Sequence, residues 1–279
     1  MRNHPESLEE AIHRQVNAAL EEDIGPGDIT ANLIPADEHG RAEIITREDA
    51  VLCGIPWVDE VFRQLGDVRI DWHSSDGDRV AADTVLCVLT GPTRTLLTGE
   101  RTALNFLQTL MGTATTARRY ADTVADRTIT VLDTRKTIPG LRAAQKYAVR
   151  CGGCTNHRTG LHDAFLIKEN HIAACGSITA AIQTARETAP DKQIIVEVEN
   201  LDELWEAAAQ RPDQLMLDNF SHEMIRKALS AAPGPSLEIS GNQTLDDLAT
   251  LPNERPLLIS SGTLTKNLTS IDLSMHLGH

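Results

Sequence analysis

Six short apolar runs in the second half of the chain constrain the fold more than any other feature of the sequence. They begin at Thr128, they are rich in aliphatic and β-branched residues, and patterns with helical spacing stand between most of them. Strands that alternate with helices at this spacing favour βα units and a parallel sheet. We therefore expect an α/β fold in this half. In chain order the runs are TITVLD, AFLIK, QIIVEVE, QLMLD, SLEIS and PLLIS.

Each of the six runs ends in polar residues or glycine. The endings are DTRK, IKENH, EVEN, LDNF, ISGN and ISSG. In a β/α barrel the site lies at the C-terminal ends of the strands, where the βα loops and the helix N-termini meet. An open parallel sheet binds its ligands at the same ends. The location of the site is therefore predicted whichever of the two folds is correct.

The first half of the chain mixes helical and strand-like patterns. A helix is expected after Ser7, which stands as an N-cap with Glu10 three residues later. The segments RAEIITRE, VRIDWH and TVLCVLTGP alternate as half-buried strands do, and one long helix or two follow from TGERTALN onward. We expect an α+β domain over residues 1–112 and a barrel domain over 113–279, with the last residues able to pack back on the first domain.

The distribution of charge narrows the ligand class. The net charge of −14 argues against nucleic acid or an anionic membrane as the main partner. The segment from Asp133 to His171 nevertheless carries +4, which leaves −18 for the rest of the chain. One cationic segment in an acidic protein indicates a small polyanionic ligand.

The sequence also bears on where the protein works. It contains no apolar run near 18 residues, and the N-terminus lacks the apolar stretch of a signal peptide. The five scattered cysteines indicate reduced thiols, so we expect a cytoplasmic protein. Cys151 and Cys154 form a lone CxxC pair, and neither a zinc site nor a redox motif is expected from it.

Two opposed sets of charges stand at the strand ends. An Arg fork matches a carboxylate or phosphate, and Lys acts as a point charge, so a cluster of cations on one rim indicates a multiply charged anion. Small residues after the last two strands are typical of a phosphate site. The cations are Arg135, Lys136, His157, Arg158 and Lys168; the acids are Glu197, Glu199 and Asp218; the small residues are Ser240, Gly241 and Asn242, then Ser260, Ser261 and Gly262.

The acidic residues suggest a magnesium site. Glu197 and Glu199 stand two apart and are expected to share a face of their strand, with Val198 pointing the other way. Asp218 and a glutamate near a polyphosphate would hold Mg²⁺ directly or through water. The pattern does not decide which of the two glutamates takes part.

The longer motifs resemble those of the quinolinate phosphoribosyltransferase family, also called nicotinate-nucleotide pyrophosphorylase. The block from DTRKTIPGLR to LIKENHI carries the resemblance, with VEVEN, LDNF, EISGN and ISSGTLTK behind it and GDITANLIP and GERTALNFLQ before it. Two departures are Cys154, where glycine is usual, and ISSGT in place of ISVGA. The resemblance implies an α/β N-terminal domain followed by an open β/α barrel, in a homodimer.

The resemblance also implies a role for individual residues. Arg135, His157, Arg158 and Lys168 would surround the carboxylates of quinolinate. Arg101 would be supplied in trans, across the dimer interface. Thr134 joins the substrate-binding residues, and the phosphoribosyl pyrophosphate and Mg²⁺ would lie among Lys136, Glu197, Asp218 and the two Ser-Gly loops.

The implied reaction joins quinolinate to the ribose, releases pyrophosphate and loses CO₂, which gives nicotinate mononucleotide. We expect Glu197 or Asp218 to stabilise the oxocarbenium-like centre and Lys136 to neutralise the leaving pyrophosphate. Three alternatives stay open at this point. They are a nicotinate phosphoribosyltransferase, a Schiff-base aldolase with Lys168 as nucleophile, and a barrel that binds phosphate without catalysis.

Overall fold

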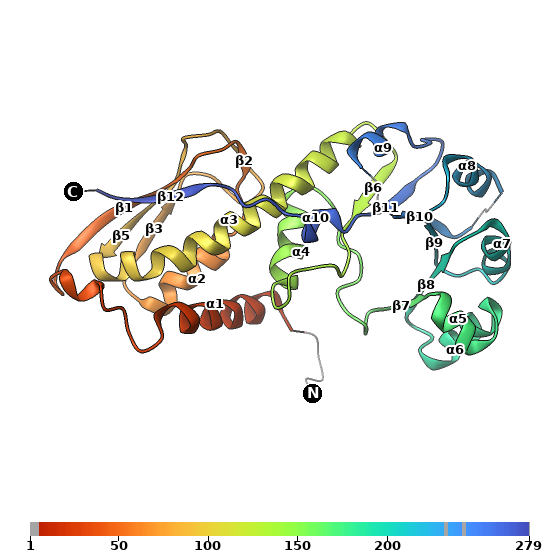
Figure 1. Ribbon diagram of the computed structural model, residues 1–279, viewed down its shortest axis with the longest axis horizontal. Helices are drawn as coiled ribbons and strands as arrows, with labels where there is room; N and C mark the ends of the chain where they lie inside the picture. The colour runs from red at the N-terminus through yellow and green to blue at the C-terminus, as the bar shows by residue number, and fades with distance from the viewer. Residues whose placement is uncertain (1–5, 232–233, 242–243, 279) are drawn as a thin grey trace. The chain divides into compact units, whose positions relative to one another are not determined.

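The computed structural model describes residues 6–231, 234–241 and 244–278. The chain forms two compact units. The first comprises residues 1–119, 137–153 and 264–279, and the second comprises 120–136 and 154–263. We keep a boundary near residue 112 as a proposal for where the folding domains divide. Figure 1 gives the labels of the elements.

The first unit is built on an antiparallel sheet with the strand order β12-β1-β5-β3. Ala42 and Ile44 of β1 are fully buried and alternate with less buried residues, as the sequence pattern predicts. The last strand of the chain pairs with the first, so the C-terminal residues complete this sheet. The strands are β1 (His39–Thr46), β3 (Arg69–Trp72), β5 (Val85–Pro92) and β12 (Leu273–Gly278), and β2 (Ala50–Val51) pairs separately with β4 (Arg79–Val80).

Helices complete the first unit. Ser7 and Glu10 form the predicted capping box at the start of α1. The indole of Trp57 is fully buried and donates to the side chain of Gln15 on α1, at 2.8 Å. These contacts place the apolar faces of the helices in one aliphatic core. The helices are α1 (Leu8–Ile24), α2 (Ile55–Leu65), α3 (Thr93–Thr123), α4 (Arg142–Cys151) and α10 (Thr263–Lys266).

The long helix α3 is continuous over 31 residues, which resolves the choice between one helix and two. Gly112 on this helix lies directly against the chain that leads to β12. A Cβ atom at Gly112 would stand 2.2 Å from the backbone oxygen of Thr269. Glycine is therefore required there by close backbone approach, although it costs about 1 kcal/mol of helix propensity relative to alanine.

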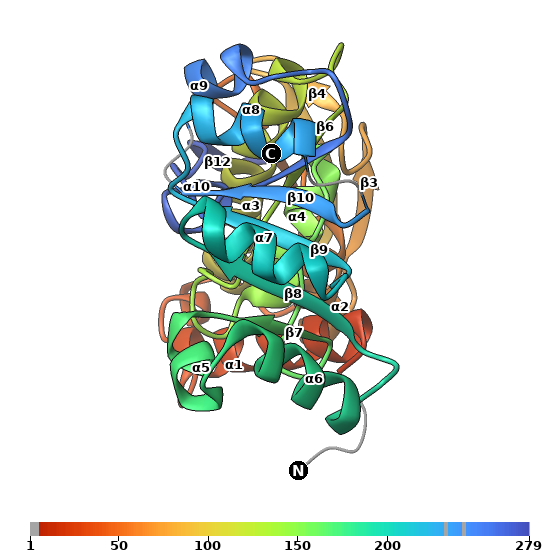
Figure 2. The same cartoon turned by 90° about the vertical axis from the view of Figure 1, so that its right-hand side faces the viewer.

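The second unit confirms the predicted α/β fold. All six apolar runs form strands of one parallel sheet with the order β6-β11-β10-β9-β8-β7. Figure 2 shows α6, α7 and α8 in front of the sheet, so these helices cover its outer face. The elements are β6 (Ile129–Leu132), β7 (Ala164–Ile167), α5 (Glu169–Cys175), α6 (Ile178–Thr188), β8 (Gln193–Val198), α7 (Leu201–Ala209), β9 (Gln214–Asp218), α8 (His222–Ala231), β10 (Ser236–Ser240), α9 (Leu245–Thr250) and β11 (Leu257–Ser260).

The parallel register brings the strand ends to one edge. Ser260 pairs with Leu132, and Ser240 pairs with Asp218, so residues from distant parts of the sequence end at the same level. The edge strands are β6 and β7, as in a barrel that stays open. Within the described ranges, none of the helices is both long and apolar enough to span a membrane.

We predict that Gly112→Ala lowers the free energy of unfolding by about 2 kcal/mol, because the added methyl group meets a backbone carbonyl that cannot turn away. The urea midpoint measures the effect. Asn105→Ala, at an exposed position of the same helix, is the matched control and should shift the free energy by less than about 0.5 kcal/mol. A Gly112→Ala protein as stable as the unmodified chain would show that the contact with Thr269 does not hold.

Candidate active site

A cavity of about 320 Å³ opens at the C-terminal ends of the parallel strands, where the sequence predicts the site. Seven separate segments contribute side chains to it, so the cavity is a product of the sheet topology and not of one loop. It is lined by Thr134, Arg135, Lys136, His157, Arg158, Leu166, Lys168, Glu197, Met216, Glu238, Ser240 and Ser260.

Asp133 at the end of β6 fixes the segment that carries His157 and Arg158. Its carboxylate is fully buried and accepts the backbone N–H of His157 at 2.9 Å and the amide of Asn156 at 2.6 Å. The backbone of Thr155 also pairs with the chain on both sides of Leu132. A buried carboxylate needs such partners. Asp133 therefore sets the positions of His157 and Arg158 at the cavity.

His157 is held between two groups that define its tautomer. Its Nδ1 accepts the backbone N–H of Arg158 at 2.8 Å, and its Nε2 lies 3.1 Å from Oε2 of Glu238. Since Nδ1 is the acceptor, Nε2 carries the proton and donates it to Glu238. Gln214 also donates to the same oxygen, while Oε1 of Glu238 has no partner among the described residues. Glu238 is thus a fully buried acid that orients the imidazole.

Lys168 and Glu197 form an ion pair across neighbouring strands. The Nζ atom of Lys168 donates to Oε2 of Glu197 at 2.6 Å, and the side chain of Glu197 is only 10% exposed. The pair joins the end of β7 to β8, so one acid compensates one cation at the centre of the cavity. A Schiff-base nucleophile must be a neutral amine, and this contact holds the Lys168 ammonium instead.

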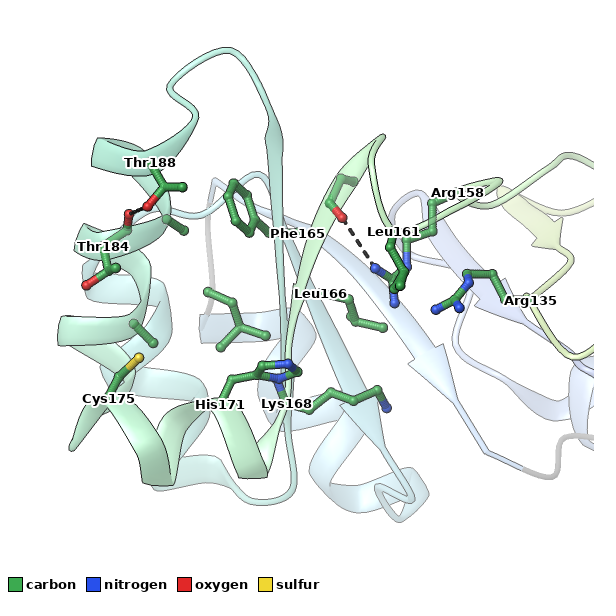
Figure 3. A pocket seen from close by; sticks show the side chains of 14 residues that line it. Arg135, Arg158, Leu161, Phe165, Leu166, Lys168, His171, Cys175, Thr184 and Thr188 are labelled. Atoms are coloured by element: carbon green, nitrogen blue, oxygen red, sulfur yellow. Dashed lines mark hydrogen bonds between the residues drawn. The ribbon is translucent and has the colours of Figure 1, made fainter. Parts of the chain in front are cut away.

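Arg135 and Arg158 face each other. Figure 3 shows their guanidinium groups pointing toward one another, with Lys168 extending to the same side. Arg158 donates to the backbone oxygen of Ala164 at 3.3 Å. Burial, and after it the neighbouring Arg135, lower the pKa of Arg158. Both arginines also line a second hollow of about 430 Å³ between β7 and α6. Two crowded guanidinium groups indicate a dianionic ligand.

Lys136 lines the same cavity and lies beside Gly262 of the loop after β11. Its backbone N–H donates to the hydroxyl of Thr134 at 3.0 Å. A Cβ atom at Gly262 would stand 2.9 Å from Cδ of Lys136 and 3.5 Å from the Thr134 hydroxyl. The glycine after β11 therefore leaves the space in which the Lys136 side chain lies.

The predicted residues of the two Ser-Gly loops lie at the ends of β10 and β11. Ser240 and Ser260 line the cavity, and the buried Ser261 donates its backbone N–H to Leu132. Gly241 has φ of +133°, a conformation that favours glycine. Asn242 lies outside the described residues.

The two glutamates of β8 differ in position. Glu197 is buried and lines the cavity, whereas β8 ends at Val198 and Glu199 is exposed beyond it. The expectation that both share one face of the strand is therefore wrong, because the alternation of side chains applies only within the strand. The backbone N–H of Glu199 instead donates to Glu203 of α7, at 2.9 Å.

Glu197 and Asp218 are suited to a shared cation. Glu197 pairs with Met216 in the register of β8 and β9, so Asp218, two residues further on, points to the same face of the sheet. Both offer carboxylate oxygens, the ligands that Mg²⁺ prefers. Asp218 is half-buried at the end of β9 and accepts the amide of Asn219 at 2.9 Å.

Three residues of this site were missed by the sequence analysis, namely Asp133, Gln214 and Glu238. The signal for Glu238 was an acid inside an apolar strand, in SLEIS, where a charge without a partner is costly. Asp133 was counted only as a charge. Gln214, at the start of β9, had no signal of its own, because its partner Glu238 lies on another strand.

Arg101 belongs to the first unit. It is exposed on α3 and lines a hollow of about 280 Å³ together with Asp23, Asp28 and Thr98.

The two cysteines of the CxxC motif fall in different units, since Cys151 ends α4 in the first unit and Cys154 is buried in the second unit.

Comparison with known proteins decides the family. The model of the quinolinate phosphoribosyl transferase C-terminal domain matches residues 113–276, and that of the N-terminal domain matches 28–111. The chain belongs to the quinolinate phosphoribosyltransferase family. Its activity is that of a nicotinate-nucleotide pyrophosphorylase, a phosphoribosyltransferase of de novo NAD synthesis.

Individual relatives agree over nearly the whole length. A probable nicotinate-nucleotide pyrophosphorylase of Bacillus subtilis is 40% identical over 95% of this chain and 92% of its own. The structure of the nicotinate-nucleotide pyrophosphorylase from Francisella tularensis has a TM-score of 0.92 at 44% identity, with 98% of both chains covered. Human nicotinic acid phosphoribosyltransferase, at 14% identity and a TM-score of 0.60, shares the fold alone.

We predict that Glu238→Ala lowers the free energy of unfolding by about 3 kcal/mol, because it leaves the Nε2–H of His157 and the amide of Gln214 buried without an acceptor. Glu238→Gln is the matched control, since its amide oxygen still accepts, and it should cost less than half as much. Equilibrium unfolding in urea measures both variants. Equal losses in the two would contradict the assignment of Glu238 as the acceptor that orients His157.

Proposed function

We propose that the cations of the cavity bind the two carboxylates of quinolinate. Arg135 and Arg158 provide planar forks, which match carboxylates, and His157 donates nothing further because its Nε2–H is already engaged by Glu238. The observation that carries the proposal is that Arg135, Arg158 and Lys168 line one cavity, with the two guanidinium groups pointing toward one another. Crowded cations of this kind are stabilised by a bound dianion.

Lys168 links substrate binding to the acid beside it. Its ammonium group donates to Glu197, at 2.6 Å. If a quinolinate carboxylate replaced Glu197 as the partner of the Lys168 ammonium, the glutamate side chain would be free to turn toward the ribose. The same lysine would then neutralise the substrate, while Glu197 becomes free to face a developing positive charge.

The phosphoribosyl side of the site is assigned to Lys136, Thr134 and the loops after β10 and β11. Lys136 supplies a point charge for the leaving pyrophosphate, and Gly262 gives its side chain room. The backbone groups around Ser240, Gly241, Ser260 and Ser261 suit phosphate oxygens. The resemblance assigns Asn242 to this side with its loop, and Glu199 stays a predicted substrate-binding residue because of its position after β8.

Glu197 and Asp218 are the residues that would hold Mg²⁺. They fit the ion because they present hard oxygens on one face of two neighbouring strands. When bound, Mg²⁺ would neutralise charge on the pyrophosphate. The carboxylate of Glu197, or that of Asp218, would stabilise the oxocarbenium-like carbon as the bond to pyrophosphate breaks.

Loss of CO₂ needs no nucleophile from the protein. Once the pyridine nitrogen is bonded to the ribose it carries a positive charge and can accept the electron pair that the departing carboxylate leaves behind. The side chains that hold the ring by its carboxylates need only to orient it and to exclude water. Arg135, Arg158 and Lys168 would orient the ring through its carboxylates.

The shared site is proposed to require a homodimer. Arg101 is exposed on a helix of the first unit, and the resemblance assigns it to the site of the partner subunit. A two-fold dimer is the commonest arrangement in which each subunit would supply such a residue to the other.

The five free thiols among the described residues support a cytoplasmic location.

We predict that Arg135→Ala and Arg158→Ala each weaken quinolinate binding by about 2 kcal/mol or more, because a carboxylate loses its fork while staying in a desolvated pocket. Titration calorimetry of quinolinate into the pure proteins measures this. Arg186→Ala, at an exposed position of α6, is the matched control and should bind as the unmodified chain does. Unchanged affinity in both cavity variants would refute the quinolinate assignment.

For Lys136→Ala we expect a lower kcat with little change in quinolinate affinity, since the lysine acts on the leaving pyrophosphate. A removed transition-state charge costs about 100-fold in kcat. The assay incubates protein with quinolinate, phosphoribosyl pyrophosphate and Mg²⁺ and follows nicotinate mononucleotide and CO₂. Lost quinolinate affinity with unchanged kcat at saturation would mean that the two halves of the site are exchanged.

The trans role of Arg101 predicts complementation between two inactive variants. Arg101→Ala and Lys136→Ala chains, unfolded and refolded together, form mixed dimers with one site that has both residues. Random pairing should restore about a quarter of the full activity. An inactive mixture in which mass measurement finds mixed dimers would place Arg101 in its own subunit's site.

A further inference from the structure

Two cysteines and an aspartate converge in the first unit, outside the residues that the reaction uses. The thiols of Cys53 and Cys151 and a carboxylate oxygen of Asp76 all lie within 4.8 Å of one another. They come from three segments: the loop before α2, the loop between β3 and β4, and the end of α4. Cys53 and Cys151 are 98 positions apart, so no sequence motif joins them.

The spacing suits a tetrahedral metal ion. Zn²⁺ binds thiolates at about 2.3 Å and carboxylate oxygens at about 2.0–2.2 Å, so its ligand atoms stand about 3.5–3.8 Å apart. Ligand atoms within 4.8 Å therefore need to move by about 1 Å at most. Two thiolates and one carboxylate form a donor set that favours Zn²⁺ over Mg²⁺ or Ca²⁺.

Asp76 is oriented by groups behind it. Its Oδ1 accepts the backbone N–H groups of Gly54 and Ile55 at 3.0 and 3.3 Å, and its Oδ2 accepts the hydroxyl of Tyr147 at 2.7 Å. Metal-binding carboxylates are commonly held by such outer partners. Because each carboxylate oxygen has a second lone pair, Oδ2 can bind an ion while it keeps the Tyr147 hydrogen bond.

Opposing effects act on the Cys151 thiol. The hydrogen bond from Cys53 lowers its pKa, while burial and the Asp76 carboxylate raise it. Arg150 lies over the Tyr147 ring, at 5.9 Å. Burial raises the pKa of Cys53, so this thiol would lose its proton only when a cation takes its place.

The alternative interpretation is that the cysteines only fill space in the core. That reading accounts for Cys53, which is fully buried, and for Cys87, which is buried in the same core. It does not account for a carboxylate held beside two thiols, since an apolar neighbour would serve packing better. From this arrangement we propose that Cys53, Asp76 and Cys151 form a binding site for a divalent transition-metal ion of the Zn²⁺ class, with water as the fourth ligand.

The test uses Co²⁺ as a spectroscopic probe on the full-length, tag-free, reduced protein. We expect one Co²⁺ per chain, with a thiolate-to-metal absorption band in the near ultraviolet that Zn²⁺ removes by displacement. Cys53→Ser and Cys151→Ser should each lose the band. Cys175→Ser is the control, because Cys175 is exposed on α5 in the second unit, and it should keep the band unchanged.

Tyr147→Phe provides a variant that keeps all three ligands. It removes the hydroxyl that orients Asp76 and should weaken Co²⁺ binding about 10-fold or more. Circular dichroism of each variant confirms folding before titration, and Cys151, which is half-buried, should tolerate serine even if Cys53 does not. A reduced protein without the thiolate band would overturn the proposal. So would a band that survives in folded Cys151→Ser, or a Cys53–Cys151 disulfide that forms in place of metal binding.

Discussion

The parallel register of β6 to β11 is the constraint on which the candidate site depends. Residues from Thr134 to Ser260 reach the cavity only because all six strands run in the same direction and end at one edge. The pairing of Ser240 with Asp218 and of Ser260 with Leu132 aligns the last residues of four strands. A strand that ran the other way would carry its polar end to the far side of the sheet.

Charge compensation is the second requirement of this edge. Two side chains of the cavity have an acid beside them from another segment: Lys168 has Glu197, and the imidazole of His157 has Glu238 and, through its backbone, Asp133. Burial of charges without such partners would cost several kcal/mol per ion. Arg135 and Arg158 face each other, which brings two positive charges to the place where a dianion is proposed to bind.

The first unit shows how poorly local motifs report three-dimensional neighbours. CGGC suggests a relation between Cys151 and Cys154, yet the neighbour of Cys151 is Cys53, on a loop 98 positions earlier. The two glutamates of VEVEN illustrate the same limit, because the strand ends between them. For Glu197 and Glu199 the spacing in the sequence was correct but the predicted shared face was not, and for Cys151 the sequence offered no sign of its neighbour Cys53.

By itself the sequence determined the α/β fold, the capping box at Ser7, the edge at which the site lies and the family. These follow from periodicity, from caps and from long specific motifs, which are local properties of the chain. Only the tertiary structure decided that Lys168 pairs with Glu197, that Glu238 orients His157 and that Gly112 and Gly262 leave space for other segments. Such contacts join residues that are 24 to 157 positions apart, from Gln214 with Glu238 to Gly112 with Thr269. Local patterns carry no information about which distant partner fills a space.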